Sequence, residues 1–300
     1  MNGSALSSRR DFLRHTQNAD GGWGYFPGKR SWLEPTLYAT LALHGDTASA
    51  KSFALIQSWA LPGGGWRMSA DVPDANWTSA LCLTVYIARS IRDEAFDSGL
   101  ARVLRTVGAE GSFLMEITQQ INPAMVEFDN RVQGWPWRPN NASWVEPTVH
   151  SVVALKHAAG LPGKSGSLLS IRARIGAAER MLMNRRCDDG GWNYGNSRVW
   201  STVLPSYPET TGIALLGLQN RPAAELRPSL AIAEKYWRET QSPLAKAWLS
   251  IALRNLGVSV SSPAELVAVR PSQDVLLAAL QCLGESGGGH QLLKTDGLSS

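Results

Sequence analysis

The chain has 300 residues, of which 44% are hydrophobic and 18% are charged, so it has enough apolar material for a large buried core. The formal net charge is only +4 and the 29 lysine and arginine residues are scattered, so a nucleic-acid partner is not expected. The three cysteines are far apart and form no Cys-x-x-Cys metal or redox clip, which fits a reducing compartment. No stretch approaches the roughly 18 apolar residues of a membrane span. These properties predict a cytoplasmic protein and leave peripheral membrane contact open.

A turn rich in glycine and tryptophan recurs along the chain and precedes each of four apolar segments. The four turns are Asp20-Gly21-Gly22-Trp23, Gly63-Gly64-Gly65-Trp66, Gln133-Gly134-Trp135-Pro136 and Asp189-Gly190-Gly191-Trp192. The segments after them begin with Trp32-Leu33-Glu34-Pro35-Thr36, Asp74-Ala75-Asn76-Trp77-Thr78, Trp144-Val145-Glu146-Pro147-Thr148 and Tyr207-Pro208-Glu209-Thr210-Thr211. Proline is tolerated in the first helical turn, and an acidic residue there interacts favourably with the helix dipole. These segments are therefore predicted to begin helices.

The pattern of apolar residues predicts helices of two kinds. Segments that are apolar almost all round follow the four starts and recur at residues 243–256 and 271–283, and such helices are buried. Amphipathic outer helices are predicted at residues 8–18, 48–60, 94–107, 167–185, 226–240 and 262–269. The first of these contains Arg9-Arg10, as a twin-arginine export signal does, but no apolar region follows, so a mature helix is preferred.

Six outer and six inner helices predict an all-α fold, a single (α/α)6 toroid that forms one domain over residues 8–284. Alternating strand patterns are absent, so no sheet is expected. Residues 108–141 are longer than an ordinary connection and are predicted to form a lid or an inserted helix. Residues 285–300 are rich in glycine and serine and are predicted to be a flexible tail.

Two sets of residues carry a resemblance to a known family. Residues 17–24 and 189–195 resemble the QW repeats of squalene-hopene cyclases and their relatives. Residues 207–218 and 270–280 resemble inner helices of that family. The chain is thus similar, over about residues 8–284, to the superfamily of terpenoid cyclases and protein prenyltransferases. The resemblance implies an α/α toroid and a small hydrophobic isoprenoid ligand, and no cofactor is expected.

The resemblance also suggests where acid chemistry would lie. Class II cyclases use an Asp-x-Asp-Asp motif as proton donor, and this chain lacks the motif. Glu34 and Glu146 fall at the proton donor's place, so both are predicted to be acids or orienting carboxylates. His150 shares a helix stripe with Glu146 and is predicted to be a base. No metal ligand is predicted.

Further residues near the helix starts are predicted to bind substrate. They are Trp32, Tyr38, Asp74, Trp77, Trp144, Tyr207 and Glu209. Simpler interpretations stay open: the glutamates cap their helices, His150 is a satisfied core residue, and the tryptophans serve only packing.

The function predicted first is a terpenoid cyclase-like or prenyltransferase-like protein that handles an isoprenoid in the toroid cavity. One alternative is a non-catalytic toroid that binds a lipid or a protein, and another is a carbohydrate-active toroid with two carboxylates across a tryptophan-lined cleft. A plugged axis would favour the binding protein, a closed apolar cavity the isoprenoid, and an open polar groove the sugar. Because relatives usually enclose substrate with a second helical domain, a second subunit or a homo-oligomer also stays open.

Overall fold

The computed structural model describes residues 2–111, 132–162, 165–199, 202–260, 273–285, 287 and 289–295, and these are mostly helical. The prediction of a helical chain is confirmed, but the expectation of no sheet is wrong. Strand β1 (Arg67–Ser69) pairs with β2 (Val72–Ala75), and β3 (Arg198–Val199) pairs with β4 (Thr202–Val203), both antiparallel. Each hairpin lies in a loop between a Gly-Trp turn and the next helix, and its strands are too short to show an alternating pattern.

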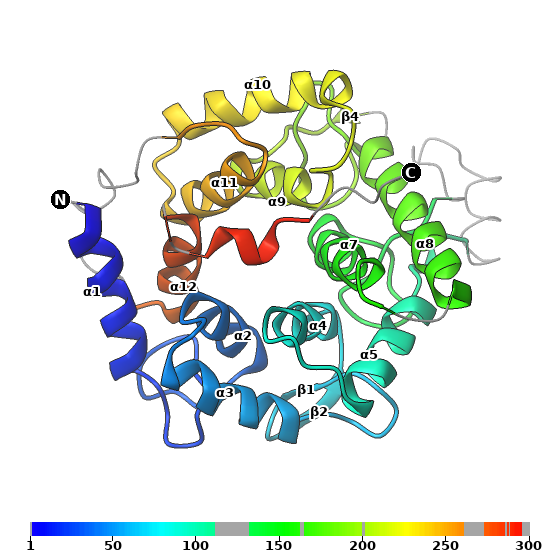
Figure 1. The fold of residues 1–300 in the computed structure, drawn as a ribbon. Coiled ribbons are helices and arrows are strands. Elements are labelled where there is room, and N and C mark those ends of the chain that lie inside the picture. The colour runs from blue at the N-terminus through cyan, green and yellow to red at the C-terminus, as the bar shows by residue number, and fades with distance from the viewer. Residues whose placement is uncertain are drawn as a thin grey trace.

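Six helices form a closed cycle of neighbours (Figure 1). They are α2 (Leu33–Ala42), α4 (Thr78–Ala88), α7 (Val145–Ala159), α9 (Pro208–Gly217), α11 (Pro243–Asn255) and α12 (Val275–Gly284). Each helix contacts the next one along the chain, and α12 contacts α2. These inner helices are buried on nearly every side, as their continuous apolar sequences require.

The remaining long helices lie outside this cycle in Figure 1. They are α1 (Asn2–His15), α3 (Thr47–Ser58), α5 (Glu94–Arg105), α8 (Ser165–Asn184) and α10 (Ala223–Glu239). Each packs on one or two inner helices, α1 on α12, α3 on α2, α5 on α4, α8 on α7, and α10 on α9 and α11. The outer helix predicted at 262–269 and most of the lid predicted at 108–141 lie outside the described residues. A short 3-10 turn, η1 (Ala109–Gly111), begins that second region.

Three of the turn tryptophans connect an outer helix to the next inner helix by the same two hydrogen bonds. The indole N–H donates to a carbonyl near the end of the outer helix, at 2.7 Å to Leu13, 2.8 Å to Val103 and 2.7 Å to Leu182 for Trp23, Trp135 and Trp192. The backbone N–H donates to a threonine Oγ1 on the inner helix, at 2.9 Å to Thr36, 2.9 Å to Thr148 and 3.1 Å to Thr211. The Gly-Trp turns are therefore structural elements of the fold, as expected.

Glycine is required in these turns for a conformational reason. Gly21 and Gly190 precede two of the Gly-Trp pairs and have φ angles of 94° and 95°, which other residues rarely adopt. A side chain at Gly22 would also collide with Ser31, because its Cβ would lie 2.6 Å from the serine Oγ.

The C-terminal segment is partly packed, so the prediction of a flexible tail is wrong for residues 289–295. The 3-10 helix η4 (His290–Leu293) contacts α11 and α4, and in Figure 1 it lies across the centre of the cycle. Leu293 is fully buried, and its carbonyl accepts a hydrogen bond from Gln219 Nε2 at 3.0 Å. Asn255 Nδ2 donates to the His290 carbonyl at 3.2 Å. One buried leucine and side-chain contacts to the ends of inner helices are enough to hold this segment.

No described helix combines the length and the apolar character needed to cross a membrane.

Candidate functional site

The starts of the inner helices bring three carboxylates together at one end of the cycle. Glu34 lies in the first turn of α2, Glu146 in the first turn of α7, and Asp274 at the N-cap of α12. The charges of Glu146 and Asp274 each raise the pKa of Glu34, so the three groups are electrostatic neighbours. The N–H of Val275 donates to the carbonyl of Tyr25 at 2.9 Å, so the loop after the first Gly-Trp turn is bonded to the start of the last inner helix, α12.

Glu34 lies in the first turn of α2 and accepts a hydrogen bond from a phenol. Tyr25 Oη donates to Glu34 Oε2 at 2.5 Å. Burial is the largest cause that raises the pKa of Glu34, the hydrogen bond from Tyr25 lowers it, and the charges of Glu146 and Asp274 raise it, with a net pKa of about 7. Glu34 is therefore a half-buried acid that is partly protonated at neutral pH.

His150 lies between a phenol and a carboxylate. Tyr38 Oη is 3.0 Å from His150 Nε2, and Glu146 Oε1 is 3.8 Å from the same nitrogen. Tyr38 and His150 are both buried, and burial is the main cause that raises the pKa of Tyr38. The stripe predicted from helix periodicity thus brings His150 to Glu146 and, across the centre of the cycle, to Tyr38 of α2. His150 has polar partners, but it also lies where it can exchange a proton with either of them.

Three rings fill the centre of the cycle at one level. Tyr38, His150 and Trp248 have ring centroids 5.8 to 6.1 Å apart, and all three are buried. They come from α2, α7 and α11, which alternate around the six-helix cycle, and each is the sixth residue of its helix. Side chains from alternate helices can touch only across the centre. A ligand therefore cannot enter deeply along the axis unless these rings move.

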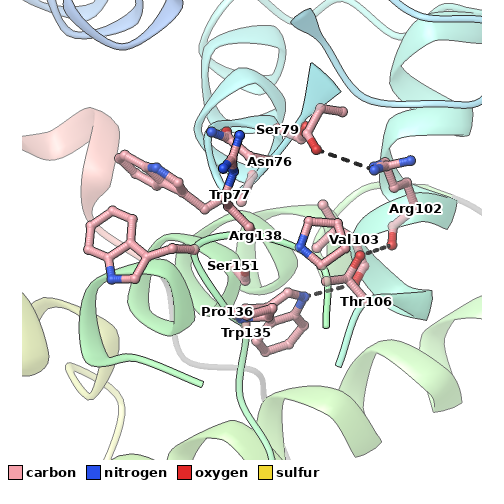
Figure 2. Close-up of a pocket in the computed structure, with 14 residues that line it drawn as sticks. Asn76, Trp77, Ser79, Arg102, Val103, Thr106, Trp135, Pro136, Arg138 and Ser151 are labelled. Atoms are coloured by element: carbon pink, nitrogen blue, oxygen red, sulfur yellow. Dashed lines mark hydrogen bonds between the residues drawn. The ribbon is translucent and has the colours of Figure 1, made fainter. Parts of the chain in front are cut away.

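A narrow pocket beside this centre is shown in Figure 2. Asn76 and Trp77 line it from the start of α4, and Arg138 lines it from the turn that carries Trp135. Its volume is about 20 Å³, enough for roughly one water molecule. Trp77 packs edge-on against Trp137, with centroids 5.1 Å apart, and its ring also lies 5.3 Å from His150. Trp77 thus extends the aromatic centre, and the pocket beside it is too small for a substrate.

A larger pocket lies next to the carboxylates, under the β3–β4 hairpin. Its volume is about 310 Å³, and three aromatic residues line it, two of which (Trp144 and Tyr207) were predicted from the sequence to bind substrate. These are Trp144, Tyr194 and Tyr207, whose side chains are 37%, 43% and 42% exposed. Tyr194 Oη donates to Glu209 Oε1 at 2.7 Å, just as Tyr25 donates to Glu34. Glu209 does not line this pocket itself but contacts it through Tyr194.

Two predicted residues are less closely involved. Trp32 is half-buried and its ring lies 6.3 Å from that of Tyr25. It is at the edge of the group formed by Glu34, Glu146 and Asp274, which is called the acidic cluster below. Asp74 is exposed on β2 and does not belong to the group around Glu34.

Sequence reasoning missed Tyr25, Trp248 and Asp274. Tyr25 could have been found from the repeat, because a tyrosine follows the turn tryptophan by two residues in the copies with Trp23 and Trp192. Trp248 could have been found from its position in its helix, because it is the sixth residue of α11, as Tyr38 and His150 are of α2 and α7. Asp274 precedes an apolar segment in the manner of an N-cap, and it caps α12 by accepting from Leu277 N at 3.0 Å.

Neither the known protein-family models nor the curated proteins contain a match to this chain. Within the described ranges, no group of three or more His, Cys, Asp or Glu side chains is placed to hold a metal ion.

Proposed function

We propose that the chain is a single (α/α)6 toroid of the terpenoid cyclase and protein prenyltransferase type, and that it handles an isoprenoid at the end where its inner helices begin. The toroid is supported by the closed contact cycle and by the repeated tryptophan links. One observation carries the functional part. Glu34 is a half-buried carboxyl with a pKa of about 7, held by Tyr25 beside a group of aromatic rings.

Glu34 is suited to general-acid catalysis, because such an acid is most effective when its pKa lies near the working pH. In the proposed reaction the Glu34 proton moves to the oxygen of an isoprenoid epoxide as a C–O bond breaks. This step leaves an alcohol, a carbocation and a Glu34 carboxylate that accepts the hydrogen bond of Tyr25. The carbocation forms C–C bonds within the substrate and then loses a C–H proton to the Glu146–His150 pair through the Glu146 carboxylate, which lies 3.8 Å from His150 Nε2, so the product is an isomer of the substrate. Aromatic faces near the site favour the positive charge.

The acid strength and the charge of the site favour a neutral oxygen as the group that is protonated. An acid with a pKa near 7 is weak for an alkene carbon but is matched to an oxygen base. Glu146 and Asp274, the two acidic neighbours of Glu34, give the site a negative character, which would repel a diphosphate. An epoxide or an allylic alcohol is therefore preferred over a prenyl diphosphate.

A second candidate is the non-catalytic toroid that binds a lipid or a protein. The observation that favours it is the filled centre, where Tyr38, His150 and Trp248 leave no depth for a long substrate. The two candidates differ in the role of Glu34. The enzyme requires the Glu34 proton for catalysis, whereas the binding protein requires only a side chain of that size at this position.

The test is to extract small molecules from the purified protein for mass spectrometry, and then to incubate the protein with squalene, its 2,3-epoxide and farnesyl diphosphate. We expect isomers of the epoxide to form, and Glu34→Gln to abolish them. The rate should fall as the pH rises through about 7, because Glu34 then loses its proton. Binding without turnover, equal in wild type and Glu34→Gln, would establish the binding protein instead. An inert protein with no bound isoprenoid would refute both.

A further inference from the structure

The pocket under the β3–β4 hairpin is called the hairpin pocket below, and most of the surface that lines it is apolar. It is lined by Ala142, Ser143, Trp144, Arg185, Asn193, Tyr194, Gly195, Asn196, Val199, Leu204 and Tyr207. Three aromatic side chains that are each more than one-third exposed face the same space. Monomeric proteins seldom leave such a group uncovered without a ligand or partner for it.

The buried polar groups in its wall are already engaged within the protein. Asn193 Nδ2 donates to the Asn196 carbonyl at 2.8 Å, and Asn193 Oδ1 accepts from Gly195 N at 2.9 Å. Arg185 donates to the carboxylate of Glu110 at 2.7 Å and also to the carbonyl of Ser143. A ligand that depends on many hydrogen bonds would therefore have to compete with these contacts, whereas an apolar ligand would leave them intact.

Ser143 is engaged in the same way, which completes the floor of the pocket. Its N–H and its hydroxyl both donate to Glu110, at 2.5 Å and 3.0 Å, and its Oγ accepts from Gly134 N at 2.9 Å. The floor is thus a closed polar network, and the surface that remains for a ligand consists largely of Trp144, Tyr194, Tyr207 and the aliphatic side chains.

The hairpin pocket adjoins the acidic cluster directly. The N–H of Val145 donates to the carbonyl of Tyr194 at 3.0 Å, so the pocket wall is tied to the first turn of α7, where Glu146 lies. The charge of Glu146 is also one of the causes that raise the pKa of Tyr194, after burial and the contact with Glu209. A ligand with one end at the acidic cluster can therefore extend into the hairpin pocket without crossing the filled centre.

We infer that the hairpin pocket binds the hydrocarbon tail of the ligand, outside the axis of the helix cycle. The inference rests on the proposed function, since it takes the ligand to be an isoprenoid whose polar end meets Glu34. It specifies the ligand further, as a chain whose tail has no hydrogen-bonding groups. It also identifies Trp144, Tyr194 and Tyr207 as the residues that determine specificity for the tail.

The test uses geraniol, a short uncharged isoprenoid alcohol, with maltose as the comparison for a sugar. Binding is measured by isothermal titration calorimetry to wild type, Trp144→Ala, Leu204→Trp and Phe26→Ala. Trp144→Ala removes one aromatic wall, and Leu204→Trp fills the pocket without removing a contact. Phe26→Ala removes an exposed aromatic residue that does not line the pocket, so it is the matched control. Thermal unfolding of each variant verifies that it is folded.

We expect geraniol to bind wild type and Phe26→Ala equally, and to bind Trp144→Ala and Leu204→Trp at least tenfold more weakly, which corresponds to about 1.4 kcal/mol. Equal binding to all variants would overturn the inference and leave the proposed function in place. Binding of maltose in place of geraniol, lost in Leu204→Trp, would overturn both. If neither compound binds, the inference also fails.

Discussion

Glu34→Gln is expected to change the pH dependence of stability, because Glu34 is a half-buried acid whose pKa rises on folding from 4.5 to about 7. An acid that holds its proton more tightly when folded stabilises the protein fully below its unfolded pKa, and this stability is lost as the pH rises toward the folded pKa. The difference of about 2.5 units, about 7 minus 4.5, corresponds to about 3 kcal/mol at 1.36 kcal/mol per unit. Glutamine cannot ionise, so the variant should lack this loss.

The assay is urea-induced unfolding of wild type and Glu34→Gln at pH 4.5 and pH 8. The wild type should lose about 3 kcal/mol more than the variant between the two pH values. Glu209→Gln is the matched control, since Glu209 accepts the same kind of tyrosine hydrogen bond from a phenol that is 43% exposed. The reasoning is refuted if the difference between wild type and Glu34→Gln is the same at both pH values, or if Glu209→Gln behaves like Glu34→Gln.

Three further substitutions test individual contacts. Trp192→Phe keeps a ring but removes the indole N–H that donates to the Leu182 carbonyl, which keeps the backbone N–H of Arg185 at 3.2 Å, so the free energy of unfolding should fall by about 0.5–1.5 kcal/mol in urea unfolding, and no loss would contradict the structural role of the turn. Tyr25→Phe removes a hydrogen bond that lowers the pKa of Glu34, so that pKa should rise in a carbon-13 NMR titration, and a fall would contradict the geometry. Arg185→Met leaves the fully buried Glu110 without its ion partner and should cost about 3–5 kcal/mol, part of which a second change, Glu110→Gln, should restore.

The inner helices could be predicted from the sequence because their signals are local. Each predicted start at Glu34, Glu146 and Glu209 is the first turn of a helix in the structure. Among the outer helices of the described residues, α3, α5, α8 and α10 begin and end within three residues of their predicted bounds, whereas α1 begins at Asn2, six residues before its predicted start. Proline, an acidic residue and a continuous apolar segment act within a few residues of one another, so no knowledge of the tertiary structure is needed. The hairpins were missed for the converse reason, since strands of two to four residues have no periodicity of their own.

The partners of the candidate residues could be predicted only in part, because they depend on which helices meet. Helical spacing is enough to pair Glu146 with His150, four residues apart on α7. It cannot show that Tyr38 from α2 and Trp248 from α11 meet His150, since this follows from the alternate places of the three helices in the closed cycle. The burial of Leu293 likewise depends on a space between inner helices that exists only after the cycle has closed.

Divergence between copies of the repeat explains how similar helix starts acquire different chemistry. The residue two positions after the turn tryptophan is tyrosine at Tyr25 and Tyr194, and each of these donates to the glutamate at the start of the next inner helix. The corresponding residue in the copy with Trp135 is Trp137, which has no hydroxyl and packs against Trp77 instead.

The glutamate of that copy is therefore available to a different partner. Glu146 lies 3.8 Å from His150, a pairing that the first copy does not have, since its residue at the equivalent helix position is Tyr38. A half-buried carboxyl held by a phenol is suited to give a proton, and an imidazole beside a carboxylate is suited to accept one. Two differences between repeats, at Trp137 and at His150, thus place the two halves of an acid–base pair on separate helices, and this arrangement is the one that the proposed isomerisation requires.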